Sequence, residues 1–288
     1  MYSANVDYYR AKTVDEAIKL LKKNPGAKLL AGGHSLIPSM KLRVAQPTAL
    51  VDIGRIKGLV GIKSTTKLLK IGALTTHNTV ANSSEVQEKC AILAEAAGQI
   101  ADQQVRNRGT IGGSLAQSDP AADYPTLMTV LDAKITASGP KGERQIDAAD
   151  FFTDLFTTAL TDSEIITNIA VPIYGKGTGG TYLKMKHPAS GFAVVGVAAI
   201  ISVNDGKCTD VRLAIGGVTP NPVRAMEAEA ALEGQAPDDA NIAVAAAKVA
   251  ASLGDAMGDY YASADYRKNM AEVMSRRALR VAAERAMG

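Results

Sequence analysis

The sequence reads AGGHS at residues 31–35 and TIGGS at residues 110–114, so each stretch places a glycine pair beside hydroxyl-bearing residues. A diphosphate needs backbone N–H donors at close range, and a residue without a Cβ lets the backbone approach the ligand. A single Gly-Gly pair usually marks only a turn, whereas two pairs flanked by serine and threonine favour a shared ligand. We therefore expect both pairs to lie at turns and to hold one diphosphate, which indicates a nucleotide cofactor.

The first pair is expected between a strand and a helix. Residues 13–16 read TVDE, a capping box that predicts a helix, and Pro25-Gly26 predicts where that helix stops. Residues 28–31, which read KLLA, favour a short buried strand, and residues 36–42 favour a short helix. A further strand is expected at residues 49–53.

The second pair follows a stretch with helical periodicity. Apolar residues recur at helical spacing from residue 86 to residue 100, which predicts one long helix over residues 85–101. Before it we expect a hairpin with strands at 60–62 and 67–73. After the second pair, the pattern predicts a helix at residues 121–132 and strands at 134–138 and around 146. A further strand is expected at residues 164–171, where Pro172 ends it.

Residues 175–180 read GKGTGG and formally match the GxGxxG motif of dinucleotide-binding folds. That motif requires a helix opening at its last glycine, yet residues 181–186 favour a strand, so we reject this fold and place a domain junction here. Beyond the junction, residues 192–203 and 210–215 predict an antiparallel hairpin. Three helices are expected to follow, at residues 223–232, 240–253 and 266–286.

Composition excludes several classes of protein. The net charge of +3 and the absence of long like-charge runs argue against nucleic acid as a partner. Cys90 and Cys208 lie far apart without ligand spacing, so we expect two buried thiols and no metal site. The longest apolar run, residues 192–203, is too short to span a membrane. Residues 1–7 lack the features of a signal peptide, so we expect a cytoplasmic protein.

Residues 30–43 and 108–123 resemble the FAD-binding medium subunits of molybdenum hydroxylases, carbon monoxide dehydrogenase medium chains in particular. The likeness continues through residues 51–53, 72–77, 100–102 and 266–277. It implies an α+β fold with a two-subdomain, PCMH-type FAD-binding domain at residues 1–174, divided near residue 57. A C-terminal flavoprotein domain, a small antiparallel sheet plus three helices, would occupy residues 178–288.

The resemblance also implies an activity. This chain would carry electrons from the [2Fe-2S] clusters of a small subunit through FAD to an external acceptor, while a large subunit holds the molybdenum cofactor. The assembly would be a dimer of heterotrimers, and no catalytic residue is expected on this chain. Two alternatives stay open: a flavin-free assembly scaffold, and a self-sufficient FAD oxidase.

Family positions that bind the cofactor transfer to sixteen residues of this sequence. They are Ala31, Gly32, Gly33, His34, Ser35, Ile100, Ala101, Thr110, Ile111, Gly112, Gly113, Ser114, Asp123, Ile166, Lys186 and Phe192. Asp123 is expected to accept hydrogen bonds from cofactor hydroxyls. Lys186 is expected near the pyrimidine edge of the flavin, where a cation stabilises the charge gained on reduction. Of the polar candidates His34 and His77, we favour His34 because it lies inside the diphosphate motif.

The sequence departs from the family pattern at three positions. Phe192 stands where carbon monoxide dehydrogenases tend to have tyrosine, Gly191 replaces an acidic residue, and Ser114 replaces a common asparagine. Phenylalanine keeps the aromatic face but loses the hydroxyl. These changes leave FAD in place but leave the substrate open among CO, a purine, an N-heterocycle and an aldehyde. The electron acceptor is open as well.

Overall fold

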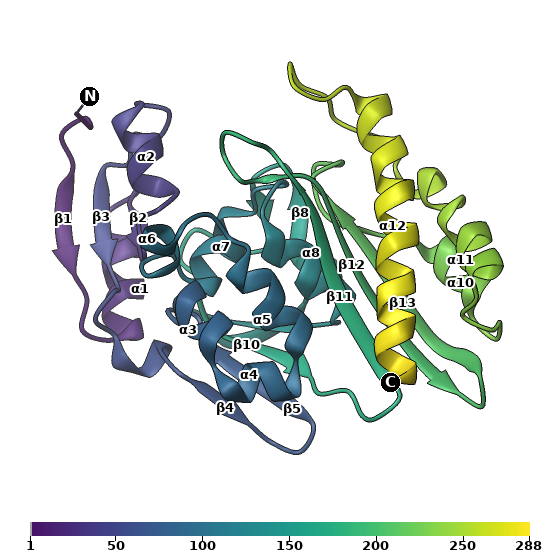
Figure 1. Ribbon diagram of the computed structural model, residues 1–288. Coiled ribbons are helices and arrows are strands. Elements are labelled where there is room, and N and C mark those ends of the chain that lie inside the picture. Colours follow the sequence, from purple (N-terminus) through teal and green to yellow (C-terminus); the bar gives the residue numbers. More distant parts are fainter. Residues whose placement is uncertain (1) are drawn as a thin grey trace.

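The computed structural model describes residues 2–288, in which three main sheets follow one another from the N-terminal to the C-terminal side of the molecule (Figure 1). A fourth sheet consists only of the strand pair β8 (Phe152–Asp154) and β9 (Thr157–Thr158). The first sheet is parallel and three-stranded, in the order β1-β3-β2. Its region comprises β1 (Asp7–Arg10), α1 (Val14–Lys23), β2 (Lys28–Leu30), α2 (Leu36–Lys41) and β3 (Ala49–Asp52). The Thr13 cap is confirmed, because its hydroxyl accepts from the Glu16 N–H. The Glu16 carboxylate accepts from the Lys12 N–H rather than from the Thr13 N–H that a capping box requires.

The second sheet is antiparallel and five-stranded, in the order β4-β5-β10-β6-β7, with short helices packed against it. Its region begins with η1 (Lys57–Leu59), β4 (Ile62–Ser64), β5 (Leu68–Gly72), α3 (His77–Asn82), α4 (Ser84–Lys89), α5 (Ala91–Gly98), α6 (Gln103–Arg106), α7 (Ile111–Gln117) and α8 (Asp123–Val130). It continues with β6 (Lys134–Gly139), β7 (Gly142–Asp147), α9 (Ala148–Phe151), β8 (Phe152–Asp154), β9 (Thr157–Thr158) and β10 (Ile165–Pro172). Every residue of α8 is buried, so this helix lies inside the molecule.

The single helix expected over residues 85–101 is wrong. The chain forms α4 and α5, which break at Cys90, where the backbone takes φ −155° and ψ 63°. The second helix ends at Gly98, and Asp102 then caps α6 by accepting from the Val105 N–H at 2.8 Å. Apolar spacing did not reveal the break, because the buried face continues across Cys90 with nearly the same period.

The third sheet is antiparallel, in the order β11-β12-β13-β14, and α12 runs across one of its faces (Figure 1). Its elements are β11 (Thr178–Lys186), β12 (Ala193–Asn204), β13 (Lys207–Gly216), β14 (Val223–Arg224), α10 (Met226–Leu232), α11 (Asp239–Ala246), η2 (Val249–Ser252) and α12 (Ala264–Met287). Residues 181–186 are strand, which confirms the rejection of a dinucleotide-binding helix. The α+β fold, with its small antiparallel sheet and helices at the C-terminal end, is confirmed.

The second and third sheets share one hydrophobic core. Tyr182, Ala198 and Ala214 of the third sheet belong to the same buried cluster as Leu69 and Ile135 of the second. Because α8 contacts both β12 and β13, it fills the space between the sheets. The loop that was expected to separate two domains therefore joins elements that bury apolar surface against each other.

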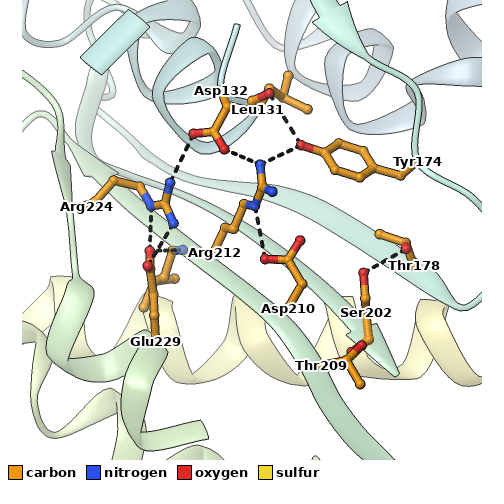
Figure 2. Close-up of polar contacts among 11 residues, drawn as sticks. Leu131, Asp132, Tyr174, Thr178, Ser202, Thr209, Asp210, Arg212, Arg224 and Glu229 are labelled. Carbon is orange, nitrogen blue, oxygen red and sulfur yellow. Dashed lines mark hydrogen bonds and ion pairs between the residues drawn. The ribbon is translucent and has the colours of Figure 1, made fainter. Parts of the chain in front are cut away.

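An ionic network reinforces this junction (Figure 2). Asp132, just after α8, accepts from Arg212 and Arg224 of the third sheet. Arg212 also donates to the Tyr174 hydroxyl at 3.0 Å, and Tyr174 donates to the Leu131 carbonyl at 3.3 Å. The network thus ties the end of α8 and the segment after β10 to the C-terminal sheet.

Candidate functional site

The first glycine pair follows β2 and forms a loop with free backbone donors. Within residues 2–288, the N–H groups of Gly32, Gly33, His34 and Ser35 donate to no protein acceptor. Gly33 has φ +77°, a left-handed conformation that glycine adopts readily. The His34 ring Nδ1 lies 2.9 Å from the Gly32 carbonyl oxygen. Consecutive unpaired amides around a left-handed residue form the kind of concavity that binds anions.

This loop lines a cleft of about 640 Å³. Four cations also line it, Arg10, Lys41, Arg55 and Arg108, against the single carboxylate of Asp52. Such an excess of positive charge in a cleft attracts an anionic ligand and holds it near the free amides. The loop and the cleft together have the chemistry of a phosphate site.

The second glycine pair lies inside α7 rather than at a turn, which corrects the sequence prediction. The amides from Ile111 to Ser114 are all engaged within the protein. The pairs are Ile111 N–H to Thr75 O at 3.1 Å, Gly112 N–H to Ala73 O at 2.9 Å, Gly113 N–H to Thr110 Oγ1 at 3.1 Å and Ser114 N–H to Thr110 O at 3.0 Å. Within residues 2–288 the Thr110 N–H has no protein acceptor, so it and the hydroxyls of Thr110 and Ser114 are left to donate to a ligand.

The glycines of this second pair serve close packing. A Cβ on Gly112 would lie 2.6 Å from the Ala73 Cβ, and a Cβ on Gly113 would lie 2.8 Å from the Thr110 Oγ1. The sequence could not reveal this use at Gly112, because Ala73, which occupies the space there, is distant along the chain. Paired glycines indicate close approach of a neighbour, which here is the protein itself.

The two pairs meet across the boundary between the first and second sheets. A Cβ on Gly32 would lie 2.9 Å from the Gly109 Cα and nearer still to the Arg108 carbonyl. A Cβ on Gly113 would lie 3.9 Å from the Ala31 Cβ. The two stretches are therefore in direct contact, as expected for residues that share one ligand.

His77 packs behind this contact. Its N–H donates to the Gly109 carbonyl at 3.0 Å, and its ring lies against Gly109 on one side and Tyr124 on the other. Burial lowers the pKa of His77 to about 4, with smaller effects from His34 and Arg106. The imidazole is neutral at physiological pH and supports the contact, whereas His34 is exposed and lines the cleft.

Asp123, at the start of α8, forms a buried polar group with two residues of β11. Its carboxylate accepts from the Tyr182 hydroxyl at 2.6 Å and from the Lys184 Nζ at 2.9 Å. Burial raises the pKa of Asp123, while Lys184 and Tyr182 oppose that shift. Sequence reasoning missed Lys184. Strand alternation was the available signal, because residues 182, 184 and 186 share one face of β11.

The other predicted positions are spread around this group. Ile100 and Ala101 form the loop between α5 and α6, and Ile166 is buried in β10. Lys186 is exposed at the end of β11, and its charge acts on Asp123. Phe192 is 46% exposed. The N–H of the next residue, Ala193, donates to the Ala121 carbonyl, close to Asp123 in the sequence. The positions therefore extend from the first sheet to the third.

Other classes of site find little support. No group of three His, Cys, Asp or Glu side chains among residues 2–288 is placed to hold a metal ion. Cys90 and Cys208 are free and buried, as expected. Of the helices in the described residues, none is both long and apolar enough to cross a membrane.

Comparison with known proteins gives the family of this chain. Residues 4–174 match the FAD binding domain in molybdopterin dehydrogenase, and residues 180–282 match the CO dehydrogenase flavoprotein C-terminal domain. The chain belongs to this flavoprotein family. It is an oxidoreductase subunit of the carbon monoxide dehydrogenase and xanthine dehydrogenase type, and the family's cofactor is FAD.

Three relatives illustrate the range of this family. The carbon monoxide dehydrogenase medium chain of Hydrogenophaga pseudoflava is 39% identical over 98% of both chains, and a solved structure of that enzyme superposes with a TM-score of 0.96 over 99% of both chains. The glyceraldehyde dehydrogenase medium chain of Sulfolobus acidocaldarius is 36% identical over 97% of this chain and 99% of the relative. Quinoline 2-oxidoreductase from Pseudomonas putida 86 has a TM-score of 0.95 at 30% identity over the full length of both chains.

Proposed function

We propose that this chain is the FAD-binding electron-transfer subunit of a heterotrimeric molybdenum hydroxylase. It would pass electrons from the [2Fe-2S] clusters of a small subunit through FAD to an external acceptor. The observation that carries the proposal is the run of unpaired amides at residues 32–35, which opens on a cationic cleft and touches the second glycine pair. This donor set fits a diphosphate.

Each pair contributes differently to the proposed diphosphate site. The amides of the first pair would donate to phosphate oxygens, and Arg10, Arg55 and Arg108 would offset the ligand charge. The hydroxyls of Thr110 and Ser114 would supply further donors. When bound, FAD would supply the redox chemistry, because a flavin exchanges electrons one or two at a time.

Residues near Asp123 would form the flavin end of the site. Lys184 holds the Asp123 carboxylate in place, and Lys186 adds an exposed positive charge on the same strand face. Positive charge there favours the reduced flavin. Phe192 would offer an aromatic face to the ring, without the hydroxyl that tyrosine provides. Ile100, Ala101 and Ile166 would line the cofactor.

We further propose a division into residues 1–57, 58–174 and 178–288, with the cofactor between the first two parts. The partners would be a molybdopterin subunit and a [2Fe-2S] subunit in a dimer of heterotrimers. Relatives named for carbon monoxide, glyceraldehyde and quinoline lie at comparable identities to this chain. The substrate would therefore be set by the molybdopterin subunit.

Titration of the full-length chain with FAD tests the proposal. Binding is expected to quench flavin fluorescence and to raise the melting temperature by linkage, by an increment that grows with FAD concentration. A melting temperature unchanged by saturating FAD, with partner subunits still bound, would instead indicate the flavin-free scaffold. Substrate turnover by the chain alone would indicate the self-sufficient oxidase.

A further inference from the structure

The loop from Gln99 to Ala101 joins α5 to α6 and carries two of the proposed cofactor-lining residues. Ala101 has φ +41°, a left-handed conformation that a side chain with a Cβ disfavours. A strained residue persists only where its surroundings hold it, and such residues concentrate at binding sites. The groups that hold this loop are therefore relevant to the proposed cofactor site.

Three consecutive carbonyl oxygens of the loop accept hydrogen bonds from two cations. The Lys184 Nζ donates to the Gln99 oxygen at 3.1 Å. A single nitrogen of Arg106, Nη1, donates to both the Ile100 and the Ala101 oxygens, each at 2.9 Å. Bonds from charged donors are stronger than those between neutral groups, so the loop is held along its whole length.

The two cations reach the loop from different parts of the chain and are themselves held. Lys184 comes from β11 of the C-terminal sheet; its side chain is 1% exposed and is paired with Asp123. Arg106 comes from α6, and its other terminal nitrogen donates to the Gln103 Oε1 at 3.1 Å. The C-terminal sheet and α6 thus fix one loop from two directions.

We propose that Arg106 and Lys184 are positioning residues for the proposed FAD site, an inference that rests on the proposed function. By binding three carbonyl groups they hold Ala101 in its left-handed conformation, so that FAD meets a loop already in its bound shape. A preformed loop loses less conformational freedom on binding, which strengthens affinity. Neither cation needs to touch the cofactor for this effect.

The test compares FAD dissociation constants of full-length variants, measured by flavin fluorescence. Arg106→Met is expected to weaken FAD binding on the order of tenfold, because two charge-assisted bonds to the loop are lost. Adding Ala101→Gly to that variant is expected to restore part of the affinity, since glycine adopts positive φ without a clash. The matched control is Arg108→Met, which removes a cation of the cleft, and there Ala101→Gly is expected to restore nothing.

Two results would overturn the positioning role. One is an Arg106→Met variant that binds FAD as tightly as the unmutated chain. The other is a loss of affinity that Ala101→Gly does not relieve and that accompanies a lower melting temperature without FAD, which would make Arg106 a general stabiliser. Failure of the proposed function is distinguishable, because the unmutated chain itself would then show no FAD affinity.

Discussion

The two glycine pairs lie in similar sequences but have different structural roles. At Gly32-Gly33 the backbone N–H groups are free and line a cationic cleft. At Gly112-Gly113 they are bonded within the protein, and the missing side chains make room for Ala73 and the Thr110 hydroxyl. The first pair exposes backbone to a ligand, and the second lets two parts of the core approach. A motif of two glycines therefore indicates close approach without saying what approaches.

The largest expected effect of a single substitution is that of Gly32→Ala on FAD binding. The new Cβ would overlap the Arg108 carbonyl, so the contact between the two pairs would have to open. We expect FAD affinity to fall about 100-fold or more, measured by fluorescence titration. Gly98→Ala is the control, because a Cβ there meets nothing within 4 Å. Retained affinity in Gly32→Ala would contradict the shared site.

Gly112→Ala should separate the two roles. Its Cβ would lie 2.6 Å from the Ala73 Cβ in the core, so the free energy of unfolding without FAD is expected to fall by about 2 kcal/mol, measured by urea denaturation. The folded fraction should bind FAD with nearly unchanged affinity. If instead affinity fell as far as in Gly32→Ala, the two pairs would have the same role and the contrast would be lost.

A pH series tests whether the region behind the second pair is core. The pKa of His77 is about 4 in the folded chain against an ordinary value of 6.5, so the unfolded chain takes up the proton first. The free energy of unfolding is therefore not reduced by His77 above pH 6.5, and it falls as the pH drops from 6.5 towards 4. We expect a loss of about 1.5 kcal/mol between pH 7.5 and 5.5. His77→Asn should flatten this profile, and an equally steep slope in that variant would exclude His77 as the cause.

The smallest effect is expected at Gly33, whose φ of +77° disfavours residues with a Cβ. Gly33→Ala should lower the free energy of unfolding by about 1 kcal/mol, and Gly33→Asn by less, because asparagine tolerates this conformation better. Urea denaturation of both variants measures the difference. A Cβ on Gly33 would also lie 3.1 Å from the Ile37 Cγ1, so identical losses in the two variants would show that this crowding rather than backbone strain sets the cost.

Local patterns predicted most of the fold. A continuous apolar run and the turn residues after it placed the hairpin formed by β12 and β13, and the capping residue Thr13 placed α1. The predictions that were wrong concern features that depend on residues distant in the sequence. The break at Cys90 leaves the apolar period nearly unchanged, and the engaged amides of α7 depend on residues 73–75. Lys184 could not be distinguished from Lys186, because both share a strand face and only the tertiary fold brings Asp123 to one of them.

The core that the second and third sheets share also limits how the two sequence families on this chain can be recombined during evolution. The family boundary falls between residues 174 and 180, yet Tyr182 and Ala198 fit against side chains from the N-terminal side of that boundary. A genetic exchange at this boundary would join two halves of a core that had never been selected to fit each other. The two modules are therefore expected to descend together, with compensating substitutions on both sides of the junction.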